Sequence, residues 1–197
     1  MKTEVIYKKA SQNKGLIKTS ELKTRSEYNA LRKGVRLNEF TKIKNGTYVL
    51  NENALDVEYR FDEIIPGSVL CLWSAWNYYG LSDCYPENGI CVAVKRGRKV
   101  HVPVYPEFEI HHLSEHIFDL GVTEEEIDGI KFKIYDRERC VCDAVKHRYK
   151  IGLDTTAEII RNYVRGEDSH DYSKLFDYSK KLHVEKYLRI ILNYELC

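Results

Sequence analysis

The chain has 197 residues, of which 43% are hydrophobic, and a formal net charge of +1 at pH 7. This composition is typical of a globular protein and argues against wholesale disorder. No apolar run reaches the length needed to cross a bilayer, and the N-terminus lacks the apolar core of a signal peptide. The six cysteines show neither zinc-knuckle nor disulfide spacing. We therefore expect reduced thiols in a cytoplasmic protein, with no membrane partner.

The near-zero net charge conceals two parts of opposite sign. Residues 1–50 carry twelve Lys and Arg against four Glu, a charge of +8, whereas residues 51–197 carry −7. A concentrated positive charge attracts polyanions such as nucleic acids, although a solvated lysine-rich surface is a common alternative. We expect two domains, 1–50 and 51–197, the second large enough to bury its own core.

The basic N-terminal part is predicted to contain three short helices. The first covers residues 5–10 and is followed by a loop and a brief extended contact at 16–17. Thr19 is a suitable N-cap for the second helix, and Ser26 for a third helix that starts at Glu27.

The third predicted helix is amphipathic. Tyr28, Leu31 and Val35 follow the spacing i, i+3, i+7 and predict one buried stripe. Asn and Arg can make bidentate contacts to base edges, and Lys and Ser can hold phosphates, so the other face suits the major groove of DNA. That face comprises Ser26, Asn29, Ala30 and Lys33, flanked by Arg32 and Arg36.

A β-hairpin is predicted next, with strands 40–44 and 47–50 around an Asn45-Gly46 type I′ turn. A two-residue loop would pair Ile43 with Tyr48 and Thr41 with Leu50 on the inner face. The outer face would then hold Lys42, Lys44, Thr47 and Val49. Helices followed by a hairpin with outward lysines indicate a winged helix-turn-helix that binds DNA. A winged helix that binds protein is the alternative.

The acidic part is predicted to be a mixed α/β domain ending in helices, which makes the whole chain α+β. Residues 51–65 read as a connector with a possible edge strand. A buried helix, capped by Ser68, is expected at 68–80, with Trp73 and Trp76 in the core rather than stacked on bases. Strands are expected at 90–94, 99–104, 108–112 and 130–135, and helices at 137–147, 155–164, 172–182 and 184–196.

Two clusters contain residue types that can bind metal ions. His112 and His116 would share a helix face beside His111, but the spacing indicates no third ligand, so we predict no metal there. Acids near a strand-to-helix junction occur in metal-dependent nucleases, but helix capping and ion pairs with neighbouring cations explain them equally well. These acids are Asp136, Glu138 and Asp143. We predict no catalytic residues and no cofactor.

Several motifs occur in a fixed order along the chain. Those of the basic part are Gly15–Leu22 and Lys42–Leu50. Those of the acidic part are Pro66–Val69, Trp73–Ala75, Tyr79–Asp83, Asp136–Arg139 and Cys142–Arg148. Together they resemble the AbiEi-type antitoxins of bacterial abortive-infection systems. The resemblance covers nearly the whole chain.

This resemblance implies a transcriptional repressor that binds inverted repeats in its own operator. It also implies a type IV antitoxin, which opposes a nucleotidyltransferase toxin without forming a stable complex with it. The DNA contacts that it implies are Lys18, Thr19, Lys23, Ser26, Asn29, Arg32, Lys33, Arg36, Lys42 and Lys44. The residues responsible for antitoxicity stay unassigned. The alternatives are a nuclease directed by the basic part and a regulator that senses a ligand through the aromatic-rich acidic part.

Overall fold

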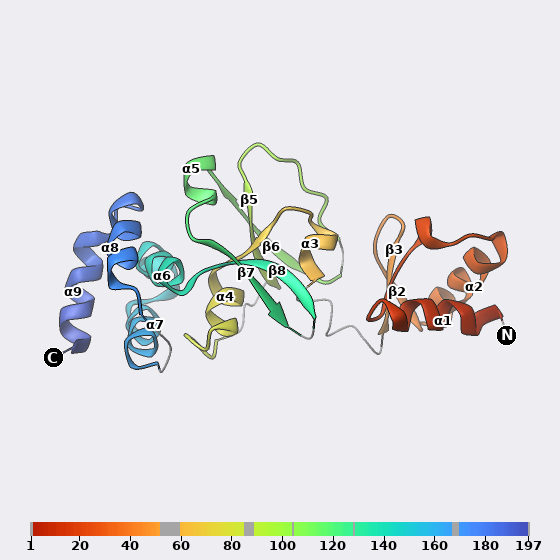
Figure 1. Cartoon of the computed structure of the whole chain (residues 1–197), viewed down its shortest axis with the longest axis horizontal. Helices are drawn as coiled ribbons and strands as arrows, with labels where there is room; N and C mark the ends of the chain where they lie inside the picture. The colour runs from red at the N-terminus through yellow and green to blue at the C-terminus, as the bar shows by residue number, and fades with distance from the viewer. Residues whose placement is uncertain are drawn as a thin grey trace. The chain divides into compact units, whose positions relative to one another are not determined.

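A computed structural model describes residues 2–51, 60–84, 89–103, 105–127, 129–166 and 170–196, and it confirms the α+β fold class (Figure 1). The chain forms two compact units. The first unit comprises Met1–Pro66, Val100–Phe108 and Ile127–Ile130, and the second comprises Gly67–Lys99, Glu109–Glu126 and Lys131–Cys197. The predicted boundary after Leu50 therefore lies inside the first unit. No helix among the described residues is long and apolar enough to cross a membrane.

Helices on a small antiparallel sheet make up the first unit. The helices are α1 (Lys2–Gln12), the 3₁₀ turn η1 (Thr19–Glu21), α2 (Arg25–Arg36) and α3 (Phe61–Ile64). The strands are β1 (Leu16–Lys18), β2 (Phe40–Lys44) and β3 (Thr47–Leu50), in the order β1-β3-β2. The extended contact predicted at 16–17 is thus the first strand of this sheet. Residues 52–59 of the predicted connector lie outside the described residues, and α3 follows them.

The core of the first unit joins α1, α2 and the sheet through a cluster of apolar side chains. Its members are Ile6, Ala10, Ile17, Leu31, Phe40 and Leu50. Gly34 allows this close packing, because a Cβ there would lie 2.7 Å from the ring of Phe40. The buried stripe of α2 is consequently rotated from the predicted one. Ala30 packs on the core, whereas Tyr28 is 41% exposed.

The start of α2 also differs from the prediction. Thr24, rather than Ser26, caps the helix and accepts a hydrogen bond from the amide of Glu27 at 3.2 Å. The Glu27 carboxylate in turn accepts bonds from the amides of Lys23 (2.6 Å) and Thr24 (3.2 Å). This reciprocal capping box satisfies backbone donors that would otherwise lack partners, and it fixes the first turn of α2.

The predicted pairing of the β2–β3 hairpin is wrong by one residue. Thr41 lies opposite Val49, and the register shifts between Lys42 and Lys44, so that Ile43 forms a bulge. Since side chains alternate along a strand, this shift buries Val49, which was predicted to point outward.

A five-stranded mixed sheet organises the second unit. Its strands are β4 (Val69–Leu70), β5 (Ile90–Lys95), β6 (Phe108–Leu113), β7 (Val122–Ile127) and β8 (Ile130–Tyr135), in the order β6-β5-β4-β8-β7. Strand β4 is antiparallel to β5 and parallel to β8. The predicted helix at 68–80 is wrong in its first turn, because Val69 and Leu70 form β4. The predicted strand at 99–104 is also wrong, because residues 99–103 form none, and residue 104 lies outside the described residues.

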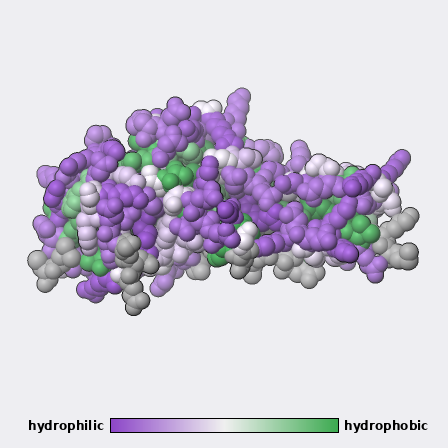
Figure 2. Space-filling model, in the orientation of Figure 1, coloured by the Kyte–Doolittle hydropathy of each residue, from purple (hydrophilic) through white to green (hydrophobic). Residues whose placement is uncertain are grey.

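Helix α6 (Arg137–Ile151) is the centre of the helical part. It contacts α4 (Leu72–Tyr78), α7 (Leu153–Arg165), α8 (Tyr172–Lys181) and α9 (Glu185–Leu196), and these last three gather around it in Figure 1. The short helix α5 (Glu115–Phe118) follows β6. Trp76 is fully buried, and its indole Nε1 donates to the carbonyl of Cys140 at 3.0 Å, which confirms that it belongs to the core. Hydrophilic side chains cover most of the face shown in Figure 2.

Candidate functional site

An exposed polar and cationic face runs along α2 in the first unit. Asn29, Arg32, Lys33 and Arg36 are all exposed on it, as predicted from the sequence. Residues three, four and seven apart share a helix face, so Arg25 also lies close to Asn29 and Arg32. In the described part of the chain, no carboxylate forms an ion pair with any of these cations.

The acids nearest in sequence do not neutralise this face. Glu27 pairs with Lys9 of α1, whose Nζ lies 2.8 Å from Oε1. Hydrogen bonds from Lys9 and from the amide of Lys23 lower the pKa of Glu27, so its carboxylate stays ionised within the capping box. The positive charges of α2 are therefore available to an external anion.

The remaining predicted DNA contacts fall into two groups. Lys23 and Lys42 are exposed, while Ser26 and Thr19 are half-buried. Lys18 and Lys44, by contrast, are both bound to α3. Lys18 Nζ lies 2.7 Å from Oε2 of Glu63, and Lys44 Nζ donates to the carbonyls of Glu63 (2.5 Å) and Ile64 (2.9 Å).

The position of Lys44 follows from the chemistry of a helix end. The last carbonyls of α3 have no partner within the helix and carry partial negative charge, which a lysine can satisfy. Burial and the neighbouring Lys18 lower the pKa of Lys44. Burial would raise the pKa of Glu63, but hydrogen bonds from Lys18 and Arg60 bring it below its usual value. Lys18 and Lys44 therefore hold the sheet to α3, a role that sequence patterns did not reveal.

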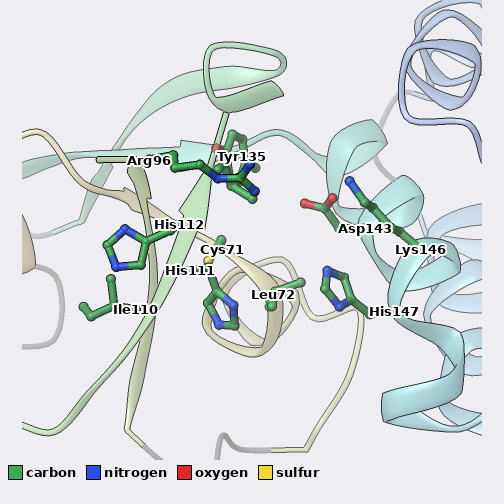
Figure 3. A pocket seen from close by; sticks show the side chains of 11 residues that line it. Cys71, Leu72, Arg96, Ile110, His111, His112, Tyr135, Asp143, Lys146 and His147 are labelled. Atoms are coloured by element: carbon green, nitrogen blue, oxygen red, sulfur yellow. The ribbon is translucent and has the colours of Figure 1, made fainter. Parts of the chain in front are cut away.

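The second unit contains a pocket of about 350 Å³ (Figure 3). Asp143, Lys146 and His147 reach it from α6, and His111 and His112 from β6. Cys71, Leu72, Arg96, Ile110, Leu113 and Tyr135 complete its lining. Leu72 has a positive φ of 45° at the start of α4, a strained conformation that often occurs at functional sites. No local pattern predicts this pocket, because its residues come from segments far apart in the chain.

The pocket is electrically positive at its rim and neutral in its depth. Arg96 is exposed and Lys146 is half-buried. Burial lowers the pKa of both His111 and His147, which keeps the two imidazoles neutral at pH 7. The single carboxylate of the lining, Asp143, is bound to Arg139, whose Nε lies 3.0 Å from each of its oxygens.

The three acids that suggested a nuclease all form hydrogen bonds or ion pairs with other residues of the protein. Asp136 caps α6 through the amide of Arg139 at 2.8 Å, as predicted, and also pairs with Lys174 at 3.0 Å. Glu138 accepts a hydrogen bond from the hydroxyl of Tyr163 at 3.0 Å. With Asp143 held by Arg139, each of the three carboxylates has a protein partner.

The histidines do not share a helix face. His112 lies on β6 and His116 on α5, so the predicted helical pair is wrong. Residues 108–113 form strand β6, in line with the strand predicted at 108–112, and α5 begins only after Ser114.

Comparisons with known proteins bear on the fold. No family model matches the chain, and no curated protein matches it. The chain is similar to a crystal structure of the RV2827C protein from Mycobacterium tuberculosis, with a TM-score of 0.53 and 12% sequence identity. The alignment covers 96% of this chain and 79% of that chain. At this identity, the similarity shows the fold alone.

Proposed function

We propose that the first unit is a winged helix-turn-helix that binds double-stranded operator DNA. The uncompensated face of α2 carries this proposal, because it combines Arg, Lys and Asn side chains on a helix whose other face is packed on a sheet. A helix of this kind fits the major groove, and the β2–β3 hairpin would be the wing beside it.

The positions of the side chains suggest which of them would contact bases and which would contact phosphates. Asn29, Arg32 and Arg36 lie on one stripe of α2 and would contact base edges. Positively charged or hydroxyl side chains around that stripe would hold phosphates, and these are Lys23, Ser26, Lys33 and, on the wing, Lys42. Thr19 lies on η1 and would contact the sugar-phosphate backbone of the DNA. Lys18 and Lys44, which are bound to α3, would position the wing rather than touch DNA.

We further propose that the protein is a cytoplasmic, non-enzymatic antitoxin of a type IV toxin–antitoxin system. In this role it represses its own operon at inverted repeats and opposes a nucleotidyltransferase toxin through its second unit, without a stable complex. The motifs that resemble AbiEi-type antitoxins support this proposal, and they extend through both units. The commitment of Asp136, Glu138 and Asp143 to structural contacts speaks against the nuclease alternative.

DNA binding is tested by fluorescence anisotropy with a duplex from the region upstream of the operon, at several salt concentrations. Replacing Arg32, Lys33 and Arg36 together by Ala should weaken binding and flatten the dependence of log K on log salt by about one unit for each lost phosphate contact. The matched control replaces three exposed cations elsewhere, Lys8, Lys180 and Lys186, by Ala. Equal affinities and equal slopes for the two triple variants would contradict the proposal.

Antitoxicity is tested separately, by co-expressing the chain with the nucleotidyltransferase of the same operon and following growth. Because the second unit is assigned to this role, the triple variant Arg32→Ala, Lys33→Ala, Arg36→Ala should still restore growth while failing to repress the operon. Growth arrest with the unaltered chain would contradict the antitoxin role and leave the DNA-binding role standing.

The pocket in Figure 3 favours a second candidate, a regulator whose DNA affinity responds to a small ligand. A volume of about 350 Å³ falls within the range of small-molecule sites. Screening small anionic metabolites by thermal shift checks it. A metabolite that binds should raise the melting temperature of the unaltered chain but not of Lys146→Ala. It should also change the affinity of the unaltered chain for operator DNA.

A further inference from the structure

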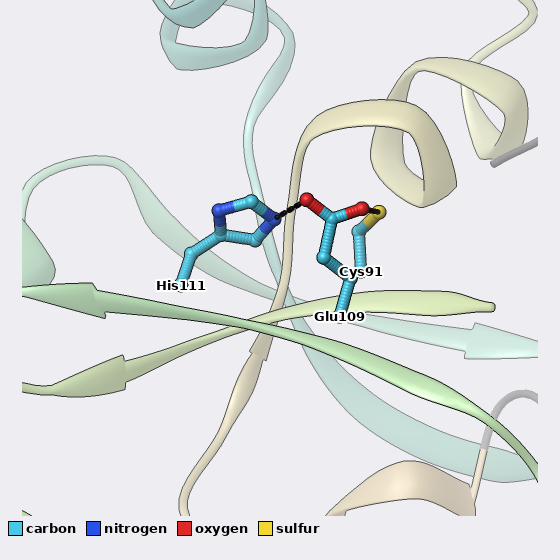
Figure 4. Close-up of side chains that lie close together, drawn as sticks. All are labelled: Cys91, Glu109 and His111. Atoms are coloured by element: carbon cyan, nitrogen blue, oxygen red, sulfur yellow. Dashed lines mark hydrogen bonds and ion pairs between the residues drawn. The ribbon is translucent and has the colours of Figure 1, made fainter. Parts of the chain in front are cut away.

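Three potential metal ligands meet on the sheet of the second unit. Cys91 lies on β5, and Glu109 and His111 lie on the neighbouring strand β6. Because side chains two residues apart share one face of a strand, Glu109 and His111 point to the same side, where Figure 4 shows them beside Cys91. The three ligand atoms all lie within 4.8 Å of one another.

The separations are close to those of a tetrahedral zinc site. Zinc binds sulfur at about 2.3 Å and nitrogen or oxygen at about 2.0–2.2 Å, which places neighbouring ligand atoms roughly 3.3–3.6 Å apart. His111 Nε2 lies 3.3 Å from Oε1 of Glu109, and Cys91 Sγ lies 3.8 Å from Oε2 of Glu109. These two distances involve different oxygens of Glu109, and the ligand atoms of His111 and Cys91 lie within 4.8 Å of each other.

The cluster also contains an unsatisfied group. His111 Nε2 is buried and has no hydrogen-bond partner, although the carboxylate of Glu109 lies nearby. Such a buried nitrogen is costly to leave without a partner, and a metal ion would satisfy it. The thiol of Cys91 is fully buried, while the side chain of Glu109 is 37% exposed, so an ion would reach the cluster along Glu109.

We propose that Cys91, Glu109 and His111 form a zinc site with three protein ligands and a fourth position for water. A set of one sulfur, one nitrogen and one oxygen donor selects a borderline ion such as Zn²⁺ over Mg²⁺ or Ca²⁺, which prefer oxygen ligands. On binding, Cys91 loses its thiol proton to solvent and its sulfur bonds to the ion. Burial and the neighbouring carboxylate of Glu109 raise the pKa of this thiol to about 12.

This site shares no residue with the DNA-binding proposal, and it shares only His111 with the pocket of Figure 3. Of the three histidines His111, His112 and His116, it uses only His111. Cys91 and Glu109 are eighteen residues apart in the chain, and only the pairing of β5 with β6 brings them together.

The test uses the full chain after removal of metals with a chelator. Titration with Zn²⁺ should show one tight equivalent per chain, and Co²⁺ should give the d–d absorption of a tetrahedral site with a thiolate-to-cobalt charge-transfer band. The cobalt spectrum of the unaltered protein reports sulfur ligation directly, and it does not depend on the folding of any variant. Absence of the charge-transfer band and of a zinc equivalent would overturn the proposal.

Variants then identify the ligands. Cys91→Ser, Glu109→Gln and His111→Ala should each weaken zinc binding by at least about tenfold, since even the loss of an outer hydrogen bond commonly costs that much. The matched controls are Cys84→Ser, an exposed cysteine outside the cluster, and His112→Ala, the neighbour of His111 on β6. Zinc binding that falls as far in the controls as in the cluster variants would overturn the assignment.

Discussion

The ammonium group of Lys44 lies 2.9 Å from the carbonyl oxygen of Ile64, at the C-terminal end of α3. A lysine at the tip of a hairpin would ordinarily be read as a phosphate contact. Here it joins the hairpin to the segment that follows it, and this contact distinguishes Lys44 from Lys42, the other lysine of β2.

The exchange Lys44→Met should therefore lower stability more than DNA affinity. The lost charged hydrogen bonds predict a loss of about 1–2 kcal/mol in the free energy of unfolding, measured in urea, with the salt slope of DNA binding unchanged. Lys42→Met is the control. It should leave the free energy of unfolding within about 0.5 kcal/mol and flatten the salt slope. The reverse pattern would show that Lys44 contacts DNA.

The same contact predicts a pH dependence through Glu63. Its folded-state pKa is lowered by Lys18 and Arg60, so in the unfolded chain it binds protons more readily than in the folded chain. Its contribution to stability is thus fully present above the unfolded pKa, about 4.3, and is lost as pH falls through the folded pKa. In Glu63→Gln, the fall in melting temperature below about pH 5 should be shallower than in the unaltered chain. An identical profile would exclude this role for Glu63.

The buried ion pair between Arg139 and Asp143 should contribute strongly to stability. The side chains of Arg139 and Asp143 are 1% and 7% exposed, and Arg139 also donates to the carbonyls of Ile117 (2.7 Å) and Leu120 (2.9 Å). Arg139→Met alone should cost about 3–5 kcal/mol, because it leaves the charge of Asp143 buried without its partner. Adding Asp143→Leu should recover part of that loss in a double-mutant cycle followed by urea unfolding. Strictly additive losses would contradict the pairing.

Gly121 should be intolerant of any side chain. Its φ of +77° disfavours other residues, and a Cβ there would lie 2.7 Å from Cβ of Arg139. Gly97 has a similar φ of +84° but nothing within 4 Å of an added Cβ. Gly121→Ala should therefore be less stable than Gly97→Ala by at least about 1 kcal/mol, since both carry the backbone strain and only the first adds a clash. Equal melting temperatures would contradict this packing.

Local patterns predicted the elements whose signal lies within one segment. The helices from Asp136 onward were found within a few residues of their ends, because their caps and glycines are explicit in the sequence. The hairpin at Asn45-Gly46 was also found, but its pairing was missed, since the register shift between Lys42 and Lys44 has no signature in the local sequence. Residues 68–80 read as one helix because the two residues of β4 are apolar in either conformation.

The candidate sites differ in how far they could be predicted from the sequence. The exposed cations of α2 followed from helix periodicity, although the rotation of the stripe toward Ala30 required the contact between Gly34 and Phe40. The contacts of Lys44 with α3 and the meeting of Cys91 with His111 depend on long-range packing, and no spacing in the sequence encodes them.

The first unit is assembled from three separate stretches of the chain, the last of them ending at Ile130. An exchange of one contiguous stretch of gene would transfer only part of such a unit. Such an exchange at residue 50 would bring in a new hairpin without the α3 carbonyls that receive Lys44, and a crossover at Pro66 would still leave behind 100–108 and 127–130. Under the proposed DNA-binding function, we expect the sequence specificity of the first unit to change by point substitutions on α2 rather than by exchange of the whole unit.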